Sequence, residues 1–274
     1  MRVNKAITVK TFNTQKALKL ALKAFNVGSM LSVGSDAKTV KGEKMGFTTG
    51  ILYLIPDLEL CPNSKRAGCY EGCLVSSGRG SFNNVKQART NRTNLYKNDK
   101  GLFFGAIIDE IERLHLKHGN KLVIRLNGTS DISFENMPIN YKGTIYDNIF
   151  KLFPNVQYYD YTKKYNRLNN PILKGINNYH LTLSYSGSNP SYANSVLDYA
   201  NKYGNNIAVV FRDKSLPGSF KGIRVKNGDD TDLRFLDNEK DDSNVYIIGL
   251  FAKGKAKKDA SGFVQDSKGL IGSF

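Results

Sequence analysis

Three cysteines gathered in one thirteen-residue stretch are the residues of this sequence best suited to chemistry. Cys61, Cys69 and Cys73 are the only cysteines among 274 residues, and their spacing is C-x7-C-x3-C. An odd number of cysteines with no export signal ahead of them argues against a disulfide framework. The stretch therefore predicts a metal site, with a redox thiol pair, inert buried thiols or coincidence as the alternatives.

Two metals suit three thiolates. Zinc prefers four ligands and would have to recruit His115, His118, His180 or a carboxylate. A [4Fe–4S] cluster can be held by three cysteines, which leaves its fourth iron open to a small molecule. Since the spacing lacks the paired C-x2-C pattern of common zinc sites, we expect an iron–sulfur cluster, and zinc is the alternative metal.

Alternating strands and helices must position these side chains. From residue 101 onward, strand patterns at 121–126, 156–161, 179–185, 207–211 and 245–251 are separated by helical patterns at 102–119, 144–153 and 191–203. Strands joined by helices pair in parallel. The sequence thus predicts an α/β fold, a full or partial (β/α) barrel of the TIM-barrel kind. We expect a β-rich N-terminal segment (1–60) packed on a barrel-like domain (61–274) that begins with the cysteine loop.

Polar residues follow several of the predicted strands. In parallel α/β folds the ligand site lies at the carboxyl ends of the strands, so these side chains are expected to share one mouth. The alternative for each is a helix cap. The candidates for the site are Asn127, Asp131, Asp160, Lys163, Ser184 and Arg212.

The charge of the chain favours a polyanionic partner. Lys and Arg number 40 against 24 Asp and Glu, a formal net charge of +16. Phosphate backbones bind such surfaces with release of counterions, so nucleic acid or a nucleotide is the expected partner, and a charge that serves only solubility is the alternative. The predicted basic helix 83–98 is expected to turn Arg89 and Arg92 outward. The candidate phosphate contacts are Arg79, Lys86, Arg89 and Arg92.

Five motifs resemble the bacteriophage family called gene product 88. They are Cys61-Pro through Cys73-Leu-Val-Ser-Ser-Gly-Arg-Gly, Val123-Ile-Arg-Leu-Asn-Gly-Thr-Ser-Asp-Ile, Tyr158-Tyr-Asp-Tyr-Thr-Lys, Tyr179-His-Leu-Thr-Leu-Ser and Ala252-Lys-Gly-Lys-Ala-Lys. The resemblance extends over nearly the whole chain after about residue 30. The layout is also similar to radical S-adenosylmethionine enzymes, although those usually space their cysteines C-x3-C-x2-C, and their glycine-rich motif has only Asn127-Gly-Thr-Ser-Asp131 as a counterpart.

The resemblance implies specific roles. Cys61, Cys69 and Cys73 would be cluster ligands, and Asn127 and Asp131 would hold the amino group or ribose of S-adenosylmethionine. A cation, Lys163 or Arg212, would hold its carboxylate, while Asp160 and Ser184 would line the barrel mouth.

Two functions follow as hypotheses. The first is an iron–sulfur enzyme of the radical type that acts on a nucleotide or nucleic acid. The second is a non-catalytic, metal-stapled protein that binds single-stranded nucleic acid by stacking bases on tyrosines such as Tyr158, Tyr161 and Tyr165. No apolar run of about eighteen residues or secretory signal is readable, so we expect no membrane span and a cytoplasmic protein, in the host cytoplasm if phage-encoded. The sequence does not indicate an oligomeric state.

Overall fold

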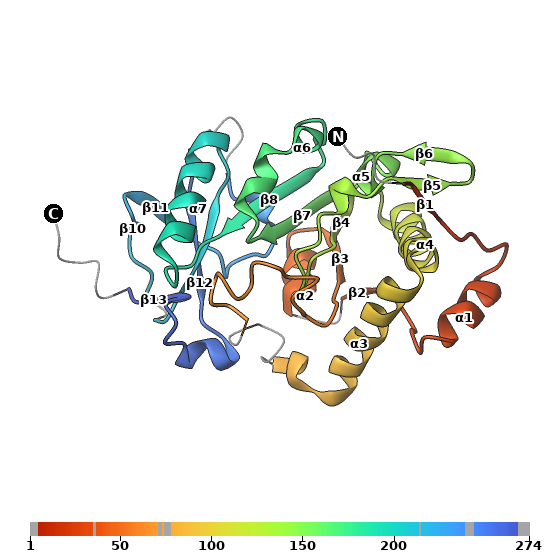
Figure 1. Cartoon of the computed structure of the whole chain (residues 1–274), viewed down its shortest axis with the longest axis horizontal. Coiled ribbons are helices and arrows are strands. Elements are labelled where there is room, and N and C mark those ends of the chain that lie inside the picture. Colours follow the sequence, from red (N-terminus) through yellow and green to blue (C-terminus); the bar gives the residue numbers. More distant parts are fainter. Residues whose placement is uncertain are drawn as a thin grey trace. The chain divides into compact units, whose positions relative to one another are not determined.

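The chain is a mixed α/β protein whose residues form two compact units. The computed structural model describes residues 5–34, 37–70, 73, 78–213, 215–238 and 244–267 (Figure 1). Unit 1 comprises Met1–Ile55, Phe82–Tyr158 and Pro171–Tyr179, and unit 2 comprises Pro56–Ser81, Tyr159–Asn170 and His180–Phe274. The two units interleave along the sequence, whereas a single boundary after residue 60 was expected.

Unit 1 contains a sheet with the strand order β2-β3-β4-β7. Its strands are β2 (Leu31–Val33), β3 (Thr48–Leu52), β4 (Leu122–Arg125) and the first residues of β7 (Gln157–Thr162). β2 runs antiparallel to β3, while β3, β4 and β7 are parallel. A second, three-stranded sheet joins β1 (Ile7–Thr8), β5 (Ile139–Tyr141) and β6 (Thr144–Tyr146).

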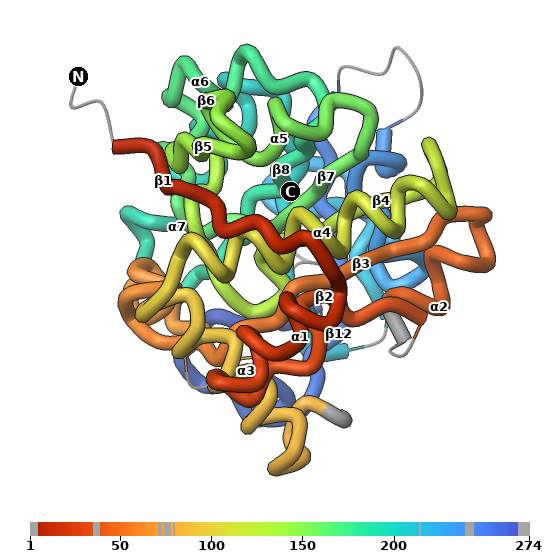
Figure 2. Tube along the Cα trace, turned by 90° about the vertical axis from the view of Figure 1, so that its right-hand side faces the viewer, coloured from red at the N-terminus to blue at the C-terminus, as the bar shows by residue number. Residues whose placement is uncertain are grey.

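Unit 1 contains six described α-helices, of which α1 and α3 pack on α4. They are α1 (Gln15–Lys23), α2 (Ala37–Lys44), α3 (Asn83–Asn98), α4 (Lys100–His118), α5 (Ile149–Leu152) and α6 (Pro171–Lys174). The Asp99 side chain caps α4 by accepting a hydrogen bond from the backbone N–H of Leu102 (3.0 Å). Figure 2 shows the N-terminal segment running across α4, where Gly105 admits the Lys10 carbonyl; a Cβ at Gly105 would lie 2.1 Å from that oxygen.

Unit 2 contains a mainly parallel sheet with the order β7-β8-β9-β12-β11-β10. The strands after β7 are β8 (Tyr179–Ser184), β9 (Ile207–Phe211), β10 (Ser219–Phe220), β11 (Ile223–Asn227), β12 (Ile247–Phe251) and β13 (Val264–Gln265), which also pairs with β9. β8, β9, β12 and β11 are parallel, and β10 is antiparallel to β11. Helix α7 (Pro190–Tyr203) connects β8 to β9, and its N-cap is Asn189. Short 3₁₀ turns η5 (Tyr165–Asn169), η6 (Arg234–Leu236) and η7 (Gly254–Lys258) follow β7, β11 and β12.

Most of the elements predicted from the sequence are confirmed, and the α/β fold class with them. The helical pattern at 144–153 is right only in its second half, which contains α5; its start is strand β6, because Lys142 and Gly143 both have positive φ (52° and 86°) and turn the chain into a hairpin. Helix α2 lies within the segment expected to be β-rich, and β10 and β11 were not expected. Within neither unit do the described strands close into a barrel, so the (β/α) barrel stays a prediction.

None of the described helices is long and apolar enough to cross a membrane.

Candidate functional site

The cysteine loop of unit 2 packs on the carboxyl ends of β7 and β8. Asn63 Nδ2 donates to the carbonyl of Lys163 (3.0 Å), the residue that follows β7. Gly68 has a φ of +62°, and a Cβ there would lie 2.8 Å from the side chains of Ser188, in the turn after β8, and of Ser261. Ser261 Oγ in turn donates to the Gly68 carbonyl (3.3 Å). Glycine at 68 therefore lets the loop approach the strand ends closely.

Hydrogen bonds within the loop place two of its cysteines. Ser64 Oγ donates to the Cys61 carbonyl (2.7 Å), and both the backbone N–H (3.1 Å) and the thiol (3.6 Å) of Cys69 point to the Ser64 carbonyl. The Asp57 carboxylate accepts from the backbone N–H of Leu60 (2.8 Å) at the start of this turn. The part of the chain from Asp57 to Cys69 is thus an ordered turn.

A lysine, a serine and a thiol come together where the loop meets the strands. Lys163 Nζ donates to Ser184 Oγ at the end of β8 (2.6 Å) and lies 4.9 Å from the centre of the Phe263 ring. Cys69 packs against the small apolar cluster that contains Phe263 and Ala252. Burial raises the pKa of the Cys69 thiol, and Lys163, hydrogen-bonded to that thiol, offsets part of the increase. The lysine therefore favours the thiolate form, which is the form that binds metals.

The three thiols fit an iron–sulfur cluster in kind. Cys61, Cys69 and Cys73 lie in one unit and form no disulfide, and the charge of Cys73 is close enough to Cys69 to raise its pKa further. In the described part of the chain, no three side chains of His, Cys, Asp or Glu are already arranged as metal ligands. Binding of a cluster would require the thiols to converge.

Two other candidates of unit 2 are Arg212, which follows β9, and Asp160, which lies within β7. Each of the three nitrogens of Arg212 contacts the protein: Nε the Asp266 carboxylate (2.6 Å), and the other two the carbonyls of Lys257 (3.0 Å) and Asp259 (2.9 Å). These contacts use three of the five N–H groups of the guanidinium. Asp160 is fully buried in β7, on the strand face opposite to Tyr161.

Asn127 and Asp131 belong to unit 1 and are both buried. Asn127 Oδ1 accepts from the backbone N–H of Ile132 (2.7 Å) and from Ser130 Oγ (2.8 Å), while its Nδ2 donates to the Ile132 carbonyl (3.0 Å). Gly128 packs against the end of β3, where a Cβ would lie 2.7 Å from the carbonyl of Leu52. The side chain of Asn127 therefore holds the turn after β4 in shape.

The basic helix α3 exposes fewer cations than the sequence indicated. Arg89 is only 7% exposed, and its guanidinium lies 4.9 Å from the centre of the Tyr53 ring. The prediction that Arg89 faces outward is wrong, because this side of α3 covers the chain after β3. Arg92 is half-buried and its Nε donates to the carbonyl of Ser29 (2.7 Å). Lys86 is exposed, as a phosphate contact would require.

Two further expectations concern single side chains. The side chain of Arg79, a candidate phosphate contact, lies outside the described residues. Tyr158 is fully buried against Phe150 (ring centres 4.9 Å apart), so its expected exposure is wrong, whereas Tyr161 and Tyr165 are half-buried.

Sequence reasoning missed a buried polar cluster in unit 2. Tyr159 OH donates to the Asp232 carboxylate (3.1 Å), and Tyr161 OH contacts the same group (3.5 Å). Arg234 is 0% exposed, and its Nε lies 3.3 Å from the carboxylate of Asp237. The signal in the sequence is the run Asp232-Leu-Arg234-Phe-Leu-Asp237, in which two carboxylates flank an arginine.

Burial controls the titration of this cluster. It raises the pKa of Asp237 from 3.8 to about 6, although Arg234 acts in the opposite direction. Burial, with the positive charge of Arg234, lowers the pKa of His180 from 6.5 to about 4. Side chains of β7, β8 and η6 thus form one electrostatically coupled group inside unit 2.

Comparison with known proteins yields one relationship. The family model described as gene product 88 matches residues 29–267, which include the cysteine loop and every strand from β2 to β13. The chain belongs to the gene product 88 family. The bacteriophage family inferred from the five motifs is thereby confirmed. Neither the curated proteins nor the solved structures include a match to this gene product 88 chain.

Proposed function

We propose that this member of the gene product 88 family is an iron–sulfur enzyme, similar to radical S-adenosylmethionine enzymes, that acts on a nucleotide or nucleic acid. The supporting observation is the position of the cysteine loop on the carboxyl ends of β7 and β8. Parallel α/β folds build their active sites at these ends. The order β7-β8-β9-β12 in unit 2 also suits a partial (β/α) barrel.

The residues of the cysteine loop and those of the strand ends would have different roles in this enzyme. Cys61, Cys69 and Cys73 would hold the cluster, which when bound supplies one-electron chemistry and an iron open to S-adenosylmethionine. Lys163 lies beside Cys69 and favours its thiolate, and Ser184 orients the lysine by accepting its hydrogen bond. The same ammonium is placed to attract the carboxylate of a bound cosubstrate.

A row of tyrosines in unit 2 favours the second candidate, a non-catalytic binder of single-stranded nucleic acid stapled by metal. The Tyr165 and Tyr199 rings lie 5.0 Å apart and the Tyr199 and Tyr203 rings 5.9 Å apart. Arg66 lies 6.0 Å from the Tyr165 ring at one end, and Lys202 lies 5.2 Å from the Tyr203 ring at the other. Aromatic rings flanked by cations can stack on bases.

Metal analysis tests the enzyme proposal. We expect protein purified without oxygen to be brown and to carry about four iron atoms and labile sulfide per chain. Cys69→Ala should lose the iron. The matched control is Ser261→Ala, which removes a contact to Gly68 but keeps all three thiols. Stoichiometric zinc without sulfide would overturn the cluster.

Reaction with S-adenosylmethionine separates the two candidates. The reconstituted protein, reduced with dithionite, should convert S-adenosylmethionine into methionine and 5′-deoxyadenosine, and Cys69→Ala should not. A loaded cluster whose spectrum is unchanged by S-adenosylmethionine, and which yields no nucleoside, would leave the metal-stapled binder as the better candidate.

A further inference from the structure

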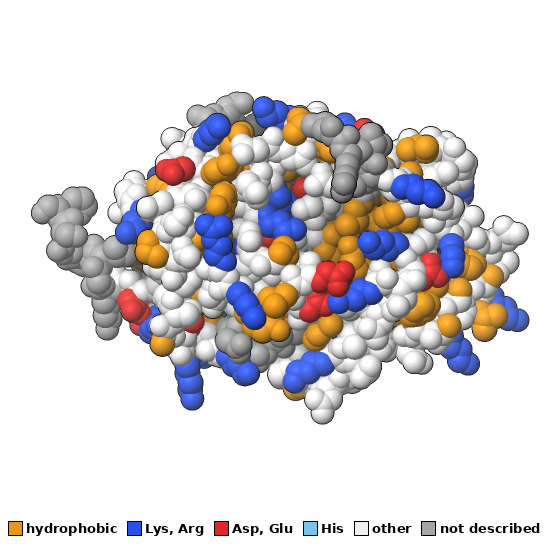
Figure 3. All heavy atoms as spheres, in the orientation of Figure 1, with side chains coloured by type: hydrophobic (Ala, Val, Ile, Leu, Met, Phe, Trp, Pro, Cys, Tyr) orange, Lys and Arg blue, Asp and Glu red, His pale blue; other side chains and the backbone are white. Residues whose placement is uncertain are grey.

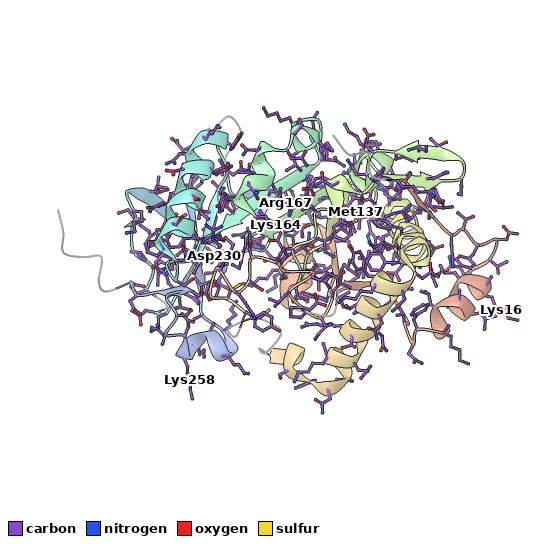
Figure 4. The ribbon with its side chains drawn as sticks, viewed as in Figure 1. Lys16, Met137, Lys164, Arg167, Asp230 and Lys258 are labelled. Atoms are coloured by element: carbon purple, nitrogen blue, oxygen red, sulfur yellow. The ribbon has the colours of Figure 1, made fainter. Side chains whose placement is uncertain are left out.

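The turn η7 presents a row of lysines directly after β12. Lys253, Lys255, Lys257 and Lys258 are exposed, whereas Ala256, between them, is buried. The labelled Lys258 points away from the ribbon in Figure 4, and the space-filling view in Figure 3 shows separate blue side chains projecting from the surface. One face of η7 is thus cationic and the other is anchored in unit 2.

The backbone of η7 is firmly held. Arg212 donates to the carbonyls of Lys257 (3.0 Å) and Asp259 (2.9 Å) and pairs with Asp266 (2.6 Å). The Asp259 carboxylate accepts from the backbone N–H of Val264 (3.0 Å). Charges displayed on an ordered backbone lose less conformational entropy when they bind a partner than charges on a loose chain.

Within the described part of the chain, three of these lysines lack an acidic partner. Lys253 pairs with Asp229 (2.5 Å). Across the described residues, no carboxylate forms an ion pair with Lys255, Lys257 or Lys258. Three ammonium groups within four residues repel one another and concentrate positive potential, which a multivalent anion relieves.

The buried side of η7 touches the cysteine loop. Ala256 belongs to the apolar cluster of Ala252, Phe263 and Val264, against which Cys69 packs. A polyanion bound to the lysines would therefore be held next to the loop that carries the thiols.

We infer that η7 is the surface of this protein that binds the phosphate backbone of nucleic acid. The inference rests on the proposed function, whose substrate class it narrows from nucleotide to nucleic acid. A membrane surface fits less well, because an interfacial segment needs apolar side chains beside its cations and the apolar residue of η7, Ala256, faces inward. Helix α3 is a weaker candidate for phosphate binding, because the guanidinium group of Arg89 packs on Tyr53 and that of Arg92 donates to the carbonyl of Ser29 within unit 1.

The test compares two triple variants of equal charge. Lys255→Gln/Lys257→Gln/Lys258→Gln removes the lysines of η7, and the matched control Lys16→Gln/Lys19→Gln/Lys23→Gln removes three exposed lysines of α1. Binding of a labelled single-stranded oligonucleotide and of a duplex is followed by fluorescence anisotropy over a range of salt concentrations. Thermal melting confirms that all the proteins fold.

The expected effect follows from counterion release. Each phosphate contact contributes a slope of about 0.7 to log K against log salt for a single strand, so loss of three contacts should flatten the slope by about 2. At about 0.1 M salt this corresponds to a loss of roughly 100-fold in affinity. The α1 variant should retain the wild-type slope.

Three results would overturn the inference. These are equal losses in both triple variants, unchanged binding in the η7 variant, and dependence on η7 for anionic phospholipid vesicles but not for either oligonucleotide. Iron is measured in the same samples. Iron-free protein that binds through η7 would refute the proposed enzyme and leave this inference standing.

Discussion

Replacement of Gly68 by alanine tests whether the cysteine loop is seated on the strand ends. The residue has a φ of +62°, in the left-handed region. An added Cβ would lie 2.8 Å from the side chains of Ser188 and Ser261, which is closer than real Cβ contacts. The variant Gly68→Ala should therefore both strain the backbone and push the loop away from its neighbours.

The structure sets the size of this effect. A left-handed conformation costs an alanine about 1 kcal/mol relative to glycine. Overpacking of a well-ordered contact costs a further ~1–3 kcal/mol. We expect Gly68→Ala to destabilise unit 2 by about 2–4 kcal/mol, which for a chain of this length lowers the melting temperature by roughly 4–8 °C.

Gly204 provides the matched control. It follows α7 in the same unit with a φ of +70°, and an added Cβ would meet nothing within 4 Å. Gly204→Ala pays the backbone cost alone, about 1 kcal/mol or roughly 2 °C. The difference between the two variants measures the packing of the loop.

Thermal melting detects a loss of stability of the whole unit. Alkylation with iodoacetamide, followed by mass spectrometry, detects a loop that leaves the strand ends while the unit stays folded. If the variant loop leaves the strand ends without unfolding the unit, Cys69 should react faster than in the wild type, because burial that now raises its pKa would be lost. Equal melting temperatures for Gly68→Ala and Gly204→Ala, together with a wild-type rate at Cys69, would refute the docked loop.

Two other predictions concern buried polar groups. Asn127→Ala removes three hydrogen bonds to Ser130 and Ile132 and should lower the free energy of unfolding, measured with urea, by about 3 kcal/mol. Ser130→Ala removes one of these bonds and should lower it by about 1 kcal/mol. Equal losses in the two variants would contradict the role of Asn127 in holding the turn. Because the pKa of Asp237 is raised to about 6, the folded protein keeps a proton that the unfolded chain releases near pH 4. The stability of the wild type should therefore fall relative to Asp237→Asn, by up to ~3 kcal/mol, as the pH rises from about 4 to about 7, and parallel pH profiles would contradict this.

The sequence was most informative where one physical pattern dominated. The strand at 207–211 and the helix at 83–98 stand where their hydrophobic periods placed them. Lys163 and Ser184 were expected to share a mouth because both follow parallel strands, and the structure brings them within 2.6 Å of each other. Such predictions need only local patterns and the direction of the chain.

The sequence was least informative where a partner distant in the chain decides the outcome. Arg89 has an exposed-looking position on its helix but is covered by Tyr53, whose approach depends on tertiary packing. The hairpin that includes β6 depends on two turn residues, Lys142 and Gly143, whose left-handed conformation the helical pattern hid. The number of cations in a sequence does not show which of them are buried, so Arg89 and the exposed lysines of η7 could not be told apart by charge.

Strand β8 carries polar side chains into the interior of unit 2. Parallel strands covered on both faces are normally apolar throughout, yet His180, Thr182 and Ser184 alternate along one face of β8. In the described structure, His180 Nε2 and Thr182 Oγ1 are buried without a hydrogen-bond partner, and each such group costs ~1–3 kcal/mol. The two unsatisfied groups thus lie on the face of β8 that ends at Ser184, the residue that accepts the hydrogen bond of Lys163 beside the cysteine loop.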